Sequence, residues 1–154
     1  MASDHRSIPL PLANSFDAVS PLLPGFDLPW LTELRARSAA RFARSGLPTQ
    51  RVERWKYTNL NALAATPFAL PGARRDPAAL SLRTSAMFEN SYRLVFENGR
   101  LRRDLSTPDA VPHGLQLMGL AEVLAEDPES MRAHLSQADN VDDALALLNL
   151  AFMS

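Results

Sequence analysis

The last residues of the sequence form a segment that is apolar on almost every side of a helix. Residues 144–153 read Ala-Leu-Ala-Leu-Leu-Asn-Leu-Ala-Phe-Met, and the preceding Asp142 and Asp143 are typical of a helix start. A helix that is apolar all round has to be buried. We therefore expect the chain to be a fragment of a longer protein, in which further polypeptide covers this helix.

Composition excludes several classes of protein. The 154 residues are 46% hydrophobic and 21% charged, which is ordinary for one globular domain. The net charge of −1 argues against a general nucleic-acid binder. Cysteine is absent, which rules out disulfides, thiolate metal sites and cysteine nucleophiles. No apolar run approaches the ~20 residues of a membrane helix. We expect a soluble, cytoplasmic protein that binds neither membrane nor nucleic acid.

Prolines divide the N-terminal part of the chain from the rest. Five of them lie within residues 1–29, and each restricts its own backbone and that of its predecessor. We expect a Pro-rich flexible arm over residues 1–27, with a short helical turn at residues 16–23. The remaining residues, 28–154, are predicted to form one domain.

The spacing of apolar and small residues predicts a helix over Pro29–Ser45. Asp27 is placed to cap it, Pro29 suits its first turn, and Gly46 is a stop signal. Several arginines are interspersed, and we expect them to cover the solvated surface of the helix: Arg35, Arg37, Arg41 and Arg44.

Alternating residues from Tyr92 onward predict a β-hairpin. Asn98-Gly99 is a strong two-residue turn signal, and residues 100–105 would return as the partner strand. Leu115–Met118 could add a third strand. Helical patterns follow from Leu120, and again after Asp127-Pro128, which suits a cap and a first helical position. The predicted class is α+β: a helical domain with a small antiparallel hairpin or sheet.

The sequence offers no convincing catalytic, cofactor or metal site. His5, His113 and His134 are far apart and lack metal-ligand spacing, and neither phosphate-binding loops nor a GxSxG elbow are present. Two alternatives stay open. One is an enzyme domain that uses His113 or His134 with a nearby acid; the other is a nucleic-acid module that uses the arginine-bearing helix.

Residues 46–60 are distinctive because two large aromatic residues flank the sole lysine of the chain. Glu53 and Lys56 could pair if this segment is locally helical. The residues alone favour a packing anchor. Trp30, Phe42, Trp55 and Tyr57 would then form the packing on the helix side of the domain, and Tyr92, Leu94 and Phe96 that on the sheet side.

Leu-Pro-Thr at residues 47–49, followed by Glu53 and by Trp55-Lys56-Tyr57-Thr58, resembles the N-terminal signature of the SufD family. These proteins are scaffold subunits of the SUF iron–sulfur cluster assembly machinery. Residues 92–99, 120–125 and 143–154 resemble later segments of the family in the same order. The resemblance covers residues 28–154, and it makes the five residues Glu53, Trp55, Lys56, Tyr57 and Thr58 a family motif for packing or partner contact.

The resemblance implies a non-catalytic domain that precedes a parallel β-helix core. It also implies a SufB-like subunit and a SufC-like ATPase as partners of the full-length protein. The cluster-related ligands and the SufC-docking region would lie beyond Ser154, so that no cofactor is expected in this fragment. The fragment could also self-associate through its apolar last helix. Because SufB shares the core architecture, a SufB-like paralogue is the alternative.

Overall fold

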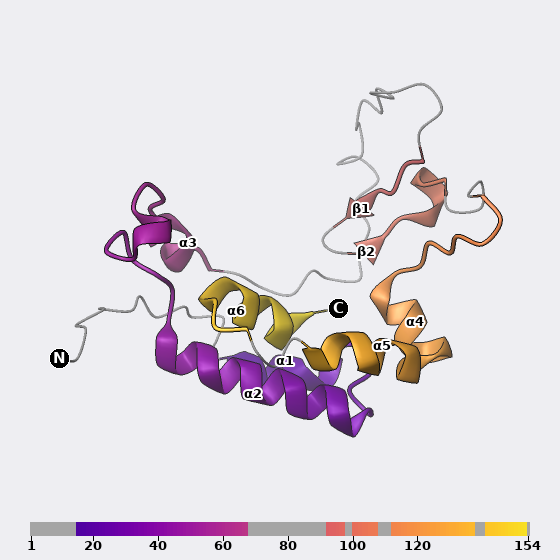
Figure 1. The fold of residues 1–154 in the computed structure, drawn as a ribbon, viewed down its shortest axis with the longest axis horizontal. Coiled ribbons are helices and arrows are strands. Elements are labelled where there is room, and N and C mark those ends of the chain that lie inside the picture. Colours follow the sequence, from indigo (N-terminus) through magenta and orange to yellow (C-terminus); the bar gives the residue numbers. More distant parts are fainter. Residues whose placement is uncertain (1–14, 68–91, 98–99, 108–111, 138–140, 154) are drawn as a thin grey trace.

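The computed structural model describes residues 15–67, 92–97, 100–107, 112–137 and 141–153, and this part of the chain is mostly helical (Figure 1). The helices are α1 (Phe16–Val19), α2 (Pro29–Ser45), α3 (Asn61–Ala65), α4 (Leu120–Glu126), α5 (Pro128–Leu135) and α6 (Ala144–Phe152). Short 3₁₀ turns span Ser20–Leu22, Glu53–Trp55 and Arg103–Leu105. The strands are β1 (Phe96–Glu97) and β2 (Arg100–Leu101).

Helix α2 has the predicted bounds and is the longest helix of the described residues. Its buried face includes Leu31, Leu34 and Phe42. The prediction that Asp27 caps it is wrong: Pro29 occupies the first helical position, which makes Leu28 the N-cap, without a side-chain hydrogen bond.

Gly46 ends α2 as predicted. Its φ of +62° is a value that side chains with a Cβ adopt reluctantly, and its N–H donates to the carbonyl of Phe42 at 2.7 Å. The chain therefore leaves the helix at a defined angle.

Helix α6 lies along α2, and the core of the domain forms between and beside them (Figure 1). One cluster joins the C-terminal half of α2 to α6 through the buried residues Phe42, Leu47 and Leu147. A second cluster joins the N-terminal half of α2 to α4 through Leu31, Leu34 and Leu124. Helix α2 is thus the element that both clusters share.

The start of α6 is confirmed, but burial on every side is not. Asp143 accepts hydrogen bonds from the N–H groups of Leu145 and Ala146 at 3.0 and 3.1 Å, which makes it the N-cap. Leu147, Leu150 and Ala151 are buried, whereas Asn149 is exposed. The helix therefore turns one face to α2, and its other apolar residues are half-buried.

The predicted helical turn at residues 16–23 is confirmed, and it packs on the domain. Val19 and Leu23 are buried, and the ring of Phe16 meets that of Phe152 edge-on with centroids 5.8 Å apart. This part of the predicted arm is therefore held by apolar contacts. Residues 1–14 lie outside the described residues.

Strands β1 and β2 pair antiparallel, with Phe96 opposite Leu101 and Glu97 opposite Arg100. The predicted turn at Asn98-Gly99 lies outside the described residues, so the hairpin itself stays a prediction. The prediction of a third strand is wrong: in the described part of the chain, residues 115–118 do not belong to a strand.

The predicted packing on the sheet side is also wrong. Tyr92, Leu94 and Phe96 are 51%, 40% and 56% exposed. Their alternation gives them a common face, but no described element covers that face. Periodicity shows which residues share a face and does not show whether another element packs on it.

Candidate interaction site

The loop between α2 and α3, residues 47–60, carries the sequence motif and is fixed in the core at both ends. Leu47 is fully buried in the cluster that contains Phe42 and Leu147. Leu60, at the other end, packs against the same cluster. The residues between these two leucines extend from the helices and form the upper-left part of the molecule in Figure 1.

Inside the loop, main-chain hydrogen bonds form successive turns. Val52, Trp55 and Thr58 each donate an N–H to the carbonyl three residues earlier, at 3.0, 2.8 and 2.9 Å. The amide Nε2 of Gln50 donates to the carbonyl of Lys56 at 3.3 Å. These bonds hold the backbone of the loop in a compact form.

The motif residues divide into one half-buried residue and an exposed remainder. Trp55 is half-buried, whereas Glu53, Lys56 and Thr58 are exposed. Tyr57 is 91% exposed, so the packing role predicted for it is wrong. Its ring lies beside the ammonium group of Lys56, with 5.6 Å between Nζ and the ring centroid.

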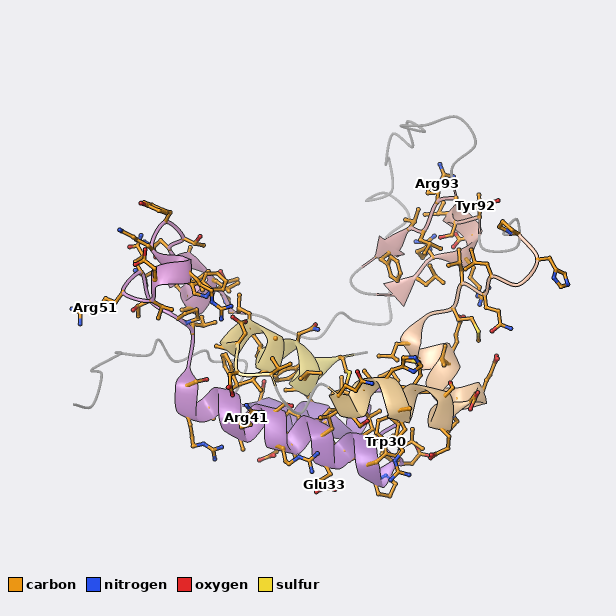
Figure 2. The ribbon with its side chains drawn as sticks, in the orientation of Figure 1. Trp30, Glu33, Arg41, Arg51, Tyr92 and Arg93 are labelled. Carbon is orange, nitrogen blue, oxygen red and sulfur yellow. The ribbon has the colours of Figure 1, made fainter. Side chains whose placement is uncertain are left out.

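Acidic residues before α6 bind two of the arginines near the loop. Arg41 Nη2 donates to the carbonyl of Val141 and to Oδ1 of Asp142, at 2.7 and 2.6 Å. Arg54 lies 3.7 Å from the carboxylate of Asp143. The anticipated Glu53–Lys56 ion pair does not occur among the described side chains. Figure 2 shows Arg51 directed away from the helices.

Arg35 is a residue whose role the sequence analysis missed, because it was assigned to the solvated surface. It is fully buried in α2. Nη2 donates to the carbonyl of Met153 at 2.8 Å, while Nε and Nη1 have no partner among the described residues. Burial lowers the pKa of Arg35 to about 10. The available signal was its position four residues after Leu31, which places it on the buried face.

Ion pairs organise the strand region and connect it to α4. Arg102 contacts Glu97 and Asp104, each at 2.6 Å, and these hydrogen bonds raise the pKa of Arg102 well above its usual value. Arg103 lies 2.8 Å from Glu122 in the first turn of α4. This contact and the N–H of Gly119 lower the pKa of Glu122.

The histidines are separate from these clusters. His113 lies in an exposed turn, and the exposed His134 on α5 contacts the carbonyl of Ser130 through Nδ1 at 2.8 Å. His5 lies outside the described residues. Across the described ranges, no three His, Asp or Glu side chains gather in a way that could hold a metal ion.

Comparison with known proteins identifies the family. A sequence profile of the SufBD protein N-terminal region matches residues 12–154, which include the loop and both core clusters. The chain belongs to the SufBD family. No solved structure gave a significant match to this SufBD chain.

A curated relative extends the comparison. The SufBD chain is 30% identical over 108 residues to the iron–sulfur cluster assembly SufBD family protein slr0076 of Synechocystis sp.. The alignment covers 70% of the chain and 24% of that relative, so the chain spans about a quarter of the relative's length. In the described part of the SufBD chain, none of the helices has both the length and the apolar character needed for a membrane span.

Proposed function

We propose that this chain is the N-terminal domain of a SufD-type scaffold subunit in iron–sulfur cluster assembly. The observation that carries the proposal is the match of residues 12–154 to the SufBD N-terminal region. The name of the Synechocystis relative, an iron–sulfur cluster assembly protein, supports it. The cluster is the cargo of the assembly, and this domain acts in the cytoplasm without chemistry of its own.

The choice of SufD over SufB rests on the spacing of the motif block Trp55-Lys56-Tyr57-Thr58. The domain contributes a structural role: it positions the scaffold relative to a SufB-like subunit and a SufC-like ATPase. The loop 47–60 supports this role because its backbone is ordered while most of its motif side chains face solvent. A SufB-like paralogue remains the alternative assignment.

Coexpression tests this proposal. The full-length protein, tagged, is produced together with the SufB-like and SufC-like subunits of its own organism, and a second strain carries the protein without residues 12–154. We expect the intact protein to copurify with both subunits. In a strain whose own copy of this protein has been deleted, the intact protein should also restore the activity of an iron–sulfur enzyme. The shortened protein should restore less activity.

Two results would contradict the proposal. Full restoration by the shortened protein would remove the positioning role of the domain. Copurification with a SufD-like subunit, in place of a SufB-like one, would assign the chain to SufB. An enzyme that receives no iron–sulfur cluster is the control, and its activity should be equal in all strains.

A further inference from the structure

Positive charge is concentrated around the second half of α2 and the loop that follows it. Residues 35–56 contain one acidic residue, Glu53, although the net charge of the whole chain is −1. The basic residues of this stretch are Arg35, Arg37, Arg41, Arg44, Arg51, Arg54 and Lys56.

Some of these basic side chains are buried or paired with an acidic residue, whereas others face solvent without an acidic partner in the described part of the chain. Arg35 is buried, and the acidic partners of three others are Glu33 for Arg37, Asp142 for Arg41 and Asp143 for Arg54. Arg44, Arg51 and Lys56 are exposed, and none of them has an acidic partner among the described residues. Arg44 lies on α2, so Arg51 and Lys56 are the two such cations of the loop. Gln50 Nε2, next to Arg51 in sequence, donates to the carbonyl of Lys56, which ties the two ends of this turn together.

An exposed aromatic side chain accompanies these two cations. Tyr57 is 91% exposed, and the Lys56 ammonium group lies 5.6 Å from its ring centroid. Tyrosine and arginine are enriched among the residues that dominate binding at protein interfaces. Because hydrogen bonds already order the loop backbone, little backbone entropy would be lost when a partner binds there.

We propose that Arg51, Lys56 and Tyr57 form a docking surface for an acidic polypeptide segment of a partner protein. The two cations would pair with carboxylates, and the ring of Tyr57 would pack on an apolar side chain between them. Charge complementarity selects this occupant. A nucleic acid is disfavoured because the chain has no net positive charge and because Glu53 lies within the same loop. This inference rests on the proposed function, since a scaffold domain needs a partner surface.

Fluorescence anisotropy tests the docking surface. The purified 154-residue chain is titrated into a labelled peptide of repeated Glu-Glu-Phe triplets, at an ionic strength of about 0.15 M, where long-range charge effects are screened. The same peptide with Gln in place of Glu is the comparison. We expect binding of the Glu peptide that weakens as salt increases, and much weaker binding of the Gln peptide.

Charge variants locate the site. Arg51→Glu and Lys56→Glu should each weaken binding about fivefold, and both together should weaken it more than tenfold. Tyr57→Ala should also weaken binding, whereas Tyr57→Phe should retain it. Arg132→Glu is the matched control: it makes the same charge change at a 56% exposed side chain of α5, and binding should stay within twofold of the parent.

Several results would overturn the proposal. The first is equal affinity for the Glu and Gln peptides. The second is an equal loss of affinity for the Glu peptide in Arg132→Glu and in the loop variants. The third is tighter binding of an oligothymidine than of the Glu peptide. Circular dichroism checks the fold of every variant, and Arg51→Gln with Lys56→Gln replaces any Glu variant that fails to fold. If the peptide does not bind but the intact protein still restores cluster assembly, the docking surface alone is refuted. If the peptide binds but the intact protein does not restore cluster assembly, the proposed function is refuted.

Discussion

Arg35 in the middle of α2 donates a hydrogen bond to the main-chain oxygen of Met153, the residue that follows α6, over 2.8 Å. This oxygen belongs to the C-terminal end of α6, where main-chain carbonyls lack intrahelical partners and a positive charge is favourable. The contact connects residues that are 118 positions apart in the sequence. The cost of burying the guanidinium group is therefore partly offset by the end of the neighbouring helix.

Two replacements of Arg35 should separate the contribution of its charge to the stability of the fold from the contribution of its volume. Two of its nitrogens have no partner in the described part of the chain, so Arg35→Met should leave the free energy of unfolding unchanged or raise it by about 1 kcal/mol. Arg35→Ala should lower it by about 2–4 kcal/mol because it leaves a cavity. Urea unfolding measures both values. Equal losses in both variants would show that the charge itself stabilises the fold.

The lowered pKa of Arg35 also predicts a dependence on alkaline pH. Between its folded-state value of about 10 and the higher unfolded-state value, the folded protein binds fewer protons, so stability contributed by this group rises with pH. Any excess stability of Arg35→Met over the parent should be constant from about pH 6 to 9 and shrink above about pH 10. Urea midpoints of the two proteins across this range provide the measurement, and a gap that widens above pH 10 would contradict the assignment.

Glu122 should stabilise the contact between the strand region and α4 in a pH-dependent way. Arg103 and the N–H of Gly119 lower its pKa, so the stabilisation is complete above the ordinary glutamate value of about 4.3 and is lost as the pH falls through the folded-state value. Glu122→Gln should be less stable than the parent at pH 7, and the difference should disappear in acid. Glu126→Gln on the same helix is the control and should show a smaller difference at neutral pH.

Gly46 should be intolerant of a side chain. Its φ of +62° and ψ of −173° lie in a region that is almost confined to glycine, so Gly46→Ala should lower the free energy of unfolding by about 1–3 kcal/mol. Gly119→Ala is the comparison, since Gly119 has an ordinary φ of −71° and a Cβ there would make only ordinary van der Waals contacts, at 3.8 Å or more. Thermal unfolding of both variants decides the point: a smaller loss at Gly46 than at Gly119 would be incompatible with a strained C-cap.

The two aromatic residues of the loop should behave differently. Trp55 is half-buried, so Trp55→Ala should cost about 2 kcal/mol of stability, less than the roughly 3–5 kcal/mol of a fully buried tryptophan. Tyr57→Ala should change stability by less than about 0.5 kcal/mol because the ring is exposed. Denaturant unfolding of the pair tests this division, and a large loss at Tyr57 would restore the packing role.

The elements that could be predicted from the sequence are those whose signals are local. The range of α2 follows from its periodicity and from Gly46. Asp127 caps α5 as predicted, and the acidic start predicted at Asp142 and Asp143 precedes α6, with Asp143 as its N-cap. The family also followed from a short motif, and the profile match confirms it at the level of SufBD.

The features that could not be predicted depend on contacts between distant segments. The burial of Arg35 requires α6 to lie beside α2, and the exposure of Tyr92, Leu94 and Phe96 depends on what covers their face. Local patterns carry neither piece of information. Asp27 failed as a cap for a local reason, since the helix begins at Pro29 and its N-cap is Leu28.

Leu47 and Leu60 enter one apolar cluster from the two ends of the loop. The core therefore sets where the chain leaves and where it returns, whatever residues lie between. Because loop closure costs depend only weakly on length, insertions between these two leucines, and substitutions of the exposed residues there, would cost the domain little stability. Related scaffold proteins could in this way differ in what the loop binds while they keep the same hydrophobic core.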